Sequence, residues 1–271
     1  MFTTVNQIKM FYQDSGKGLP VVLLHGYPLN HTIWAEVTSH LESKARVISP
    51  DLRGHGLTDA PPGVYTMRQM AADVAALLDG LEIQQAVLVG HSMGGYISLA
   101  FAQAYPDRLL GLGMVSSQAA ADPPERREGR YQTAAQVEKE GVGVVANSMP
   151  DKLTNRAALA EYLRQLILTM KPAGVVGALK GMAKRPEMGE WISTLSVPVM
   201  VIAGGQDGLV PLDRAREMAQ RFPHGHLTIC LQSGHMPMME APQEVAAALE
   251  QLVNDVENGG FGELIAGQPN N

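Results

Sequence analysis

The sequence of 271 residues has little cysteine, few aromatic residues and no long apolar run. Its one cysteine, Cys230, excludes an internal disulfide and agrees with a reducing compartment. No apolar run is long enough to cross a bilayer, and the N-terminal residues lack the charged and apolar regions of a signal peptide. From these absences we expect a cytoplasmic protein that has no membrane partner.

A block of basic residues is also missing. The chain has 21 lysines and arginines against 27 acidic residues, and its formal net charge of −6 argues against nucleic acid as a partner. The 8 histidines do not show the spacing of a metal site, and there is no H-E-x-x-H motif or cysteine cluster. We therefore expect no bound metal.

Short apolar runs alternate with helix-like stretches along most of the chain. Continuous apolar strands separated by helices indicate an α/β protein, with a parallel sheet covered by helices on both faces. The runs that we interpret as buried strands are Val21–Leu24, Arg46–Ser49, Ala86–Val89, Gly111–Val115, Val199–Ala203 and Leu227–Leu231.

This alternation stops between residues 118 and 190. That stretch contains no convincing strand but offers several amphipathic helical segments. An all-helical insertion of this size between two sheet strands is expected to cover the strand ends. We predict a core domain of residues 1–117 and 191–257, a helical cap domain of residues 118–190, and a loosely held tail, rich in Gly and Asn, at residues 258–271.

The most informative motif is Gly90-His91-Ser92-Met93-Gly94, which reads G-x-S-x-G. An apolar run precedes it and a helix-like stretch follows it, so Ser92 is expected in a sharp strand-to-helix turn, the nucleophile elbow. The glycines allow the strand and the helix to pass close together. The turn presents the hydroxyl at a helix N-terminus, where backbone N–H groups favour negative charge.

A serine hydroxyl is a weak nucleophile until a base takes its proton and a third group orients that base. The best candidate base is His235, and the best orienting acid is Asp207; each follows a buried apolar run. In an open α/β sheet, ligands bind beyond the carboxyl ends of the strands. The order Ser92, Asp207, His235 is the one that this elbow predicts. Asp213 is a rival acid that a helix start explains, and His55 is a rival base that precedes the serine.

Negative charge that develops on a substrate carbonyl needs two backbone N–H donors. One should be that of Met93, directly after the nucleophile, and the other that of Tyr27 in His25-Gly26-Tyr27-Pro28. Another polar loop, Asp51-Leu52-Arg53-Gly54-His55-Gly56, follows the second buried strand. We interpret it as structural, with its acid and its arginine paired to hold the loop near the floor of the site.

Together, these motifs resemble those of α/β-hydrolase-fold serine hydrolases over Pro20 to Val256. Within that superfamily the chain looks closest to the branch of small esterases, enol-lactonases and cofactor-free haloperoxidases (perhydrolases). The resemblance implies a mostly parallel eight-stranded sheet, a helical cap, and ester-type hydrolysis without a cofactor. Relatives that act on epoxides or haloalkanes carry an acid where this chain has Ser92. His25-Gly26 departs from the Asn-Ser of many enol-lactonases, and Pro28 resembles perhydrolases, which implies a side activity with peroxide.

The resulting hypothesis is a carboxylic ester hydrolase that cleaves a small ester or lactone through an acyl-enzyme. Ser92, Asp207 and His235 would form the catalytic triad, and Tyr27 and Met93 the oxyanion hole. Two alternatives remain open. The same three residues could hydrolyse a carbon–carbon bond in a diketone-type ring-fission product, or the scaffold could bind a ligand without catalysis.

Overall fold

The computed structural model describes residues 1–259, so the predicted tail lies outside the described residues except for Asn258 and Gly259. Eight strands form one sheet in the order β1-β2-β4-β3-β5-β6-β7-β8. The strands are β1 (Phe2–Val5), β2 (Ile8–Ser15), β3 (Pro20–Leu24), β4 (Arg46–Pro50), β5 (Ala86–His91), β6 (Leu109–Val115), β7 (Val199–Gly204) and β8 (Gly225–Cys230).

The sheet is mostly parallel, as the apolar runs predict. Strands β4, β3, β5, β6, β7 and β8 pair in parallel, whereas β2 pairs antiparallel with both β1 and β4. The β1–β2 hairpin turns at Asn6 and Gln7, which both have positive φ angles, 44° and 66°. In the parallel part, the carboxyl ends of β3, β5, β7 and β8 lie at one edge, and the candidate functional loops leave from there.

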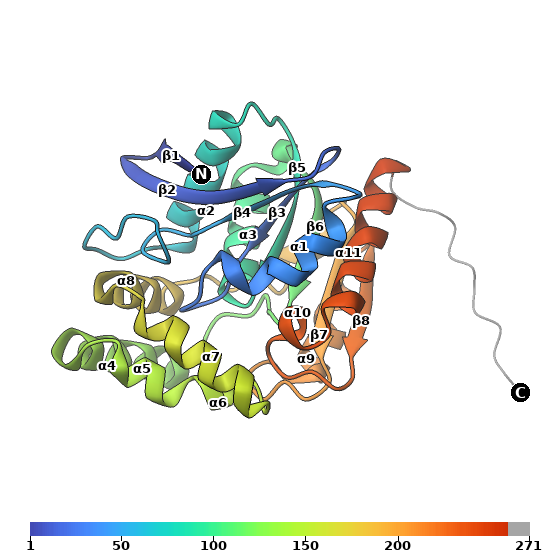
Figure 1. The fold of residues 1–271 in the computed structure, drawn as a ribbon. Helices are drawn as coiled ribbons and strands as arrows, with labels where there is room; N and C mark the ends of the chain where they lie inside the picture. Colours follow the sequence, from blue (N-terminus) through green and yellow to red (C-terminus); the bar gives the residue numbers. More distant parts are fainter. Residues whose placement is uncertain (260–271) are drawn as a thin grey trace, which may run out of the picture.

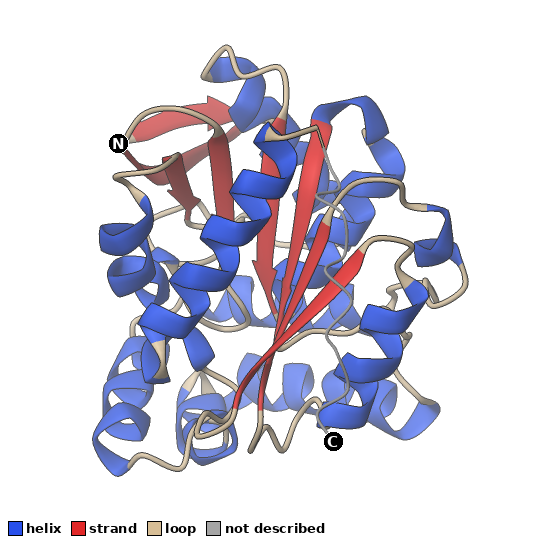
Figure 2. Ribbon diagram, turned by 90° about the vertical axis from the view of Figure 1, so that its right-hand side faces the viewer, coloured by secondary structure: helices blue, strands red, loops and turns tan. Residues whose placement is uncertain are grey.

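Helices cover both faces of the sheet. Figure 1 shows α1 and α11 on one face and α2 and α3 on the other, and Figure 2 shows helices on both sides of the sheet. These and the other helices outside the inserted segment are α1 (Ala35–Leu41), α2 (Met67–Gly80), α3 (Met93–Ala104), α9 (Leu212–Arg221), α10 (Pro237–Glu240) and α11 (Pro242–Glu257), with short 3₁₀ helices η1 (His31–Trp34), η2 (Pro106–Arg108) and η3 (Trp191–Thr194). Thr66 caps α2, and its hydroxyl oxygen accepts a hydrogen bond from the Gln69 N–H.

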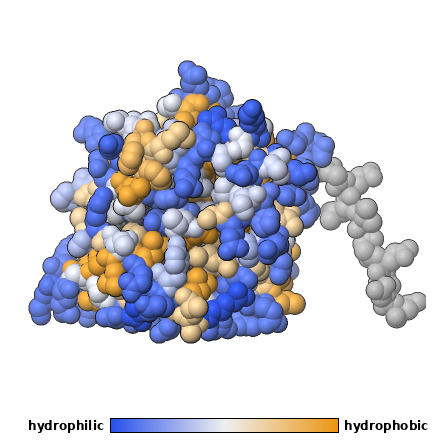
Figure 3. Space-filling model, viewed as in Figure 1, coloured by the Kyte–Doolittle hydropathy of each residue, from blue (hydrophilic) through white to orange (hydrophobic). Residues whose placement is uncertain are grey.

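The segment between β6 and β7 is helical in the described structure. Its helices are α4 (Pro124–Glu140), α5 (Gly143–Ser148), α6 (Pro150–Leu153), α7 (Ala157–Leu168) and α8 (Pro172–Ala183). They lie together beyond one edge of the sheet (Figure 1), and we refer to them as the α4–α8 layer. On the same view, apolar patches reach the surface over this layer (Figure 3).

Among residues 1–259, no single helix has both the length and the apolar composition needed to cross a membrane. Helices α7 and α8 meet that test only together, across a bend of 105°. Strands β3 and β5 are almost entirely buried, which places the core along the middle of the sheet. Cys230 is also fully buried, and burial raises the pKa of its thiol to about 12, so this cysteine is an inert part of the core.

Candidate active site

Ser92 occupies the turn between β5 and α3 in a strained backbone conformation. Its φ and ψ angles are 49° and −110°, in a region that costs a non-glycine residue about 1–3 kcal/mol. Gly90 has no room for a side chain, because a Cβ there would lie 2.2 Å from the Gly94 carbonyl carbon. Two hydrogen bonds hold the turn: the Ser92 N–H donates to Val115 O at 2.9 Å, and Ser117 Oγ donates to Ser92 O at 2.8 Å.

The structure brings Asp207 and His235 into direct contact. His235 Nδ1 lies 2.8 Å from Asp207 Oδ2, and both side chains are almost completely buried. The other carboxylate oxygen of Asp207 accepts hydrogen bonds from the N–H groups of Leu209 and Val210. Burial on its own would raise the pKa of Asp207, but the hydrogen bond and charge of His235 and these two N–H groups lower it overall.

An ionised Asp207 fixes the tautomer of its partner. A carboxylate only accepts, so His235 Nδ1 carries the hydrogen and donates it to Asp207 Oδ2. The Nε2 atom of the neutral imidazole then has a free lone pair. This arrangement can take up a proton at Nε2, and Asp207 can stabilise the resulting imidazolium.

His91 joins the serine turn to the loop that carries His235. His91 Nε2 lies 2.9 Å from the backbone oxygen of His235, and the two rings are 4.9 Å apart. Burial lowers the pKa of His91 far below its ordinary value, so its ring is neutral. Since the carbonyl accepts, Nε2 of His91 donates. The residue beside the predicted nucleophile thus holds the backbone of the predicted base.

The loop after β3 packs against the serine turn. A Cβ on Gly26 would lie 2.4 Å from His91 Nδ1 and 3.2 Å from Ser92 Cβ, so only glycine fits there. Next in the chain, Tyr27 precedes Pro28 across a cis peptide bond. Among the described residues, neither the Tyr27 N–H nor the Met93 N–H donates a hydrogen bond to another protein group. Both predicted donors therefore have no acceptor among the described residues.

Residues 20–242 match the family model described as "alpha/beta hydrolase fold". The chain belongs to the α/β hydrolase fold family. It is 38% identical in sequence to a thermophilic esterase from Thermogutta terrifontis, whose structure was solved with malate bound; the TM-score is 0.91, over 94% of this chain and 98% of that one. It is also 30% identical to the 2-hydroxymuconate semialdehyde hydrolase of Pseudomonas sp. (strain CF600), over 92% and 90% of the two chains. The 3-oxoadipate enol-lactonase 2 of Acinetobacter baylyi is 26% identical, over 92% and 95%.

In this α/β hydrolase, the loop after β4 differs from its sequence-based prediction. Asp51 and Arg53 were expected to pair, but each binds elsewhere. Asp51 accepts hydrogen bonds from the backbone and the ring of His31 and from the Leu57 N–H. Arg53 makes two hydrogen bonds of 2.7 Å to Asp73 on α2. The prediction of a structural loop agrees with these contacts, but the predicted acid–arginine pair is wrong because both partners lie on other elements.

The rival candidates lie away from the Asp207–His235 pair. His55 is fully buried with its Nδ1 3.0 Å from Arg53 O, and burial lowers its pKa to about 4. Its ring contacts His25 and Tyr27 rather than the serine turn. Asp213 lies in the first turn of α9, where it pairs with Arg216. Within residues 1–259, no group of three or more His, Cys, Asp or Glu side chains could hold a metal ion.

Sequence reasoning missed Glu240, which anchors the His235 loop of the hydrolase. This nearly buried carboxylate accepts hydrogen bonds from the Gly234 N–H at 2.7 Å and from Thr154 Oγ1 at 2.5 Å. The His235 N–H donates in turn to Leu153 O at 2.9 Å. The loop is therefore tied to the α4–α8 layer. One signal was available in the sequence, because an acid in the apolar stretch Met236-Pro237-Met238-Met239-Glu240 needs partners.

Proposed function

We propose that this α/β hydrolase is a carboxylic ester hydrolase that cleaves a small ester or lactone through an acyl-enzyme intermediate. The observation that carries the proposal is the buried 2.8 Å contact between His235 Nδ1 and Asp207 Oδ2. The loop that carries His235 is in turn joined to the Ser92 turn through His91. The 38% identity to an esterase over 94% of the chain supports the same reaction class.

In the proposed first half-reaction, Ser92 Oγ attacks the substrate carbonyl while His235 Nε2 removes the proton of the Ser92 hydroxyl. Asp207 keeps the imidazole in the required tautomer and stabilises its charged form. The free N–H groups of Tyr27 and Met93 donate to the oxygen that becomes negative, and one such donor is worth on the order of 10²–10³ in rate. His235 then gives its proton to the leaving alcohol, and the acyl group remains on Ser92.

In the second half-reaction, water attacks the acyl-enzyme and His235 Nε2 takes a proton from it. Collapse of the second tetrahedral intermediate releases the carboxylic acid and returns the proton to Ser92 Oγ. No step in this scheme needs a cofactor. Residues 118–190 would act as a cap domain that selects the substrate. This segment reaches the His235 loop, where Leu153 O accepts a hydrogen bond from the His235 N–H.

The test is pre-steady-state hydrolysis of a chromogenic acetate ester. We expect a burst of chromophore as the acyl-enzyme accumulates, and Ser92→Ala should lose both the burst and on the order of 10⁴–10⁶ in turnover. Ser98→Ala is the matched control, because Ser98 lies on α3 and donates only to Gly94 O. Unchanged turnover in Ser92→Ala would refute the assignment.

Carbon–carbon bond hydrolysis is the second candidate, favoured by the 30% identity to 2-hydroxymuconate semialdehyde hydrolase. It would use the same three side chains, so the substrate decides between the two. Short acyl esters, lactones and a ring-fission dienoate should be compared on one enzyme preparation. If kcat/KM is highest for the dienoate, carbon–carbon bond hydrolysis is the main activity and ester hydrolysis is not.

The third candidate is a ligand-binding protein without catalysis, since a fold does not determine a function. A fluorophosphonate probe separates this from both hydrolases, because only an activated serine reacts with it. We expect one label per chain on Ser92 and none in the Ser92→Ala variant. A perhydrolase side activity would appear as peracid formation from acetate and peroxide that also depends on Ser92.

A further inference from the structure

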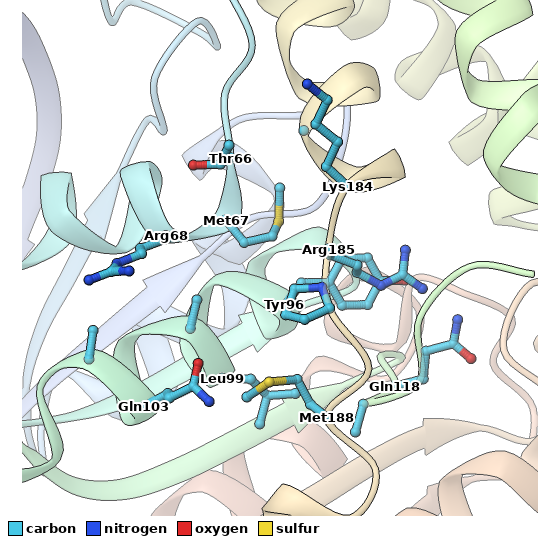
Figure 4. Close-up of a pocket in the computed structure, with 15 residues that line it drawn as sticks. Thr66, Met67, Arg68, Tyr96, Leu99, Gln103, Gln118, Lys184, Arg185 and Met188 are labelled. Atoms are coloured by element: carbon cyan, nitrogen blue, oxygen red, sulfur yellow. The ribbon is translucent and has the colours of Figure 1, made fainter.

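A cavity of 570 Å³ lies outside the Ser92 site, between the start of α2, one face of α3 and the chain that follows α8 (Figure 4). We call it the α2–α3 cavity. Ser92, Asp207 and His235 are not among the residues that line it. Its volume falls in the range of about 300–1,000 Å³ that is typical of small-molecule sites. The catalytic proposal makes no use of this space.

The inner wall of the α2–α3 cavity is apolar and elongated. Tyr96, Leu99, Ala100, Gln103 and Ala104, all apolar or aromatic except Gln103, line it with the spacing of a single helix face, so the wall follows α3 for about 12 Å. Met67 and Met188, both buried, contribute from α2 and from the chain after α8 (Figure 4). A wall of this shape and composition suits an extended alkyl chain.

The charged groups around the cavity are all positive. Arg68, Lys184 and Arg185 line it, and no aspartate or glutamate does. Arg68 and Lys184 are exposed, lie on different elements (Figure 4), and have no ion-pair partner among the described residues. This local excess of positive charge contrasts with the net charge of −6 of the whole chain.

Arg185 adds a buried positive charge to the wall. Its guanidinium lies 4.1 Å from the centre of the Tyr96 ring, and its side chain is 3% exposed. Its carboxylate partner, Asp122, is shared with Arg126 and Arg130, so three guanidinium groups surround one carboxylate. Among these four side chains the positive charges outnumber the negative one, which favours an anionic ligand.

We propose that the α2–α3 cavity is a second, non-catalytic site that binds an amphipathic monocarboxylate of the alkanoic acid class. The alkyl chain lies along α3 on Tyr96, Leu99 and Ala100. The carboxylate lies at the rim, where Arg68 and Lys184 supply the opposite charge. The site does not depend on ester hydrolysis, because none of its residues belongs to the proposed triad or oxyanion hole.

The test measures binding of octanoate to the Ser92→Ala protein by isothermal titration calorimetry. Octanoate should bind saturably. Octanol should bind more weakly because it lacks the negative charge, and butanoate should bind more weakly because it lacks most of the alkyl chain. In the Arg68→Glu/Lys184→Glu variant, octanoate affinity should fall about tenfold or more while octanol affinity stays unchanged. Lys17→Glu/Lys44→Glu is the matched control, because both lysines are exposed and neither lines the cavity.

A cavity-filling variant keeps the test independent of the charged rim. Ala100→Phe should reduce the affinity for octanoate and for octanol alike, because its ring would occupy the space of the alkyl chain. A crystal structure with octanoate should place its carboxylate near Arg68 or Lys184. The proposal is overturned if octanoate does not bind, if charge reversal leaves its affinity unchanged, or if the crystal shows octanoate only beside Ser92.

Discussion

The turn that carries Ser92 and the loop that carries His235 are held in place in different ways. Ser92 lies between two regular elements, where Gly90 and Gly94 bring the strand and helix backbones together. The His235 loop depends instead on hydrogen bonds with separate parts of the chain: His91 donates to it, whereas Leu153 O and the Glu240 carboxylate accept from it. Close packing of a strand and a helix, with hydrogen bonds to neighbouring β6 and from Ser117, thus fixes the proposed nucleophile. By contrast, the proposed base depends on contacts of its loop with the His91 and Glu240 side chains and with the α4–α8 layer.

The largest expected effect comes from adding a side chain to the serine turn. In Gly90→Ala, a Cβ would lie 2.2 Å from the Gly94 carbonyl carbon and 2.3 Å from the Gly95 nitrogen. The backbones must separate, so we expect a loss of at least about 3 kcal/mol in the free energy of unfolding, together with the activity. Urea unfolding measures this change.

The matched control for that variant is Gly129→Ala in α4. Nothing lies within 4 Å of a Cβ built on Gly129, and this glycine lies inside a helix. The substitution should stabilise the protein by roughly 0.5–1 kcal/mol. Equal effects of the two substitutions would mean that the tight packing at Gly90 does not hold the turn.

The next effect is on the chemistry of the His235 loop. Asp207→Asn can donate to His235 Nδ1, which would favour the tautomer whose hydrogen is on Nε2 and so block proton uptake there. We expect kcat to fall about 10⁴-fold with little change in the fold. Steady-state kinetics with the chromogenic ester measures the loss. Asp213→Asn is the control and should keep full activity. Equal losses in the two variants would mean that the loss of a negative charge, and not the contact of Asp207 with His235, lowers kcat.

A smaller loss should follow when the anchor of the same loop is changed. Glu240→Gln replaces one acceptor oxygen by an NH2 donor. This donor either faces the Gly234 N–H, which cannot accept, or leaves the hydroxyl hydrogen of Thr154 without its acceptor. The displaced loop should lower kcat about 10–100-fold and leave KM nearly unchanged. Glu257→Gln, at the exposed end of α11, is the control. If KM rises and kcat stays constant, Glu240 supports the binding pocket rather than His235.

The lowered pKa of Asp207 predicts how this loop responds to acid. Because the pKa is lower in the folded protein than the ordinary value of 3.8, the carboxylate stabilises the fold above pH 3.8. That stabilisation is lost as the pH falls through the folded-state pKa. The difference in free energy of unfolding between wild type and Asp207→Asn should therefore be constant above about pH 5 and shrink below pH 3.8. A difference that already shrinks between neutral pH and about pH 5 would contradict this linkage.

The same contrast explains which features could be predicted from the sequence. Ser92, Asp207 and His235 each follow an apolar run, and parallel strands bring their carboxyl ends to one edge, so a linear pattern is enough to predict that their loops lie close together. The parallel sheet follows from the same runs. The β1–β2 turn was harder to place, because Asn6-Gln7 lacks the glycine that usually marks such a turn.

Contacts between distant side chains could not be predicted in this way. Arg53 pairs with Asp73 rather than with Asp51 because the loop after β4 turns its arginine toward α2. Glu240 meets Thr154 only because the α4–α8 layer returns to the His235 loop. Such pairs depend on the path of two loops in space, and neither composition nor periodicity contains that path. The short helices α5 and α6 have too few residues for a helical period to show in the sequence.

The smallest effect should come from removing a single contact between the His235 loop and the α4–α8 layer. Thr154→Val keeps the shape of the side chain but leaves one oxygen of Glu240 without its hydroxyl partner and the Arg156 N–H without its acceptor. The cost should be about 1–3 kcal/mol in stability. Since Glu240 still accepts from the Gly234 N–H and Leu153 O still accepts from His235, kcat should fall only a few-fold. Thr169→Val, on the exposed end of α7, is the isosteric control. A loss as large as that of Glu240→Gln would mean that the layer, and not the carboxylate, holds the His235 loop in place.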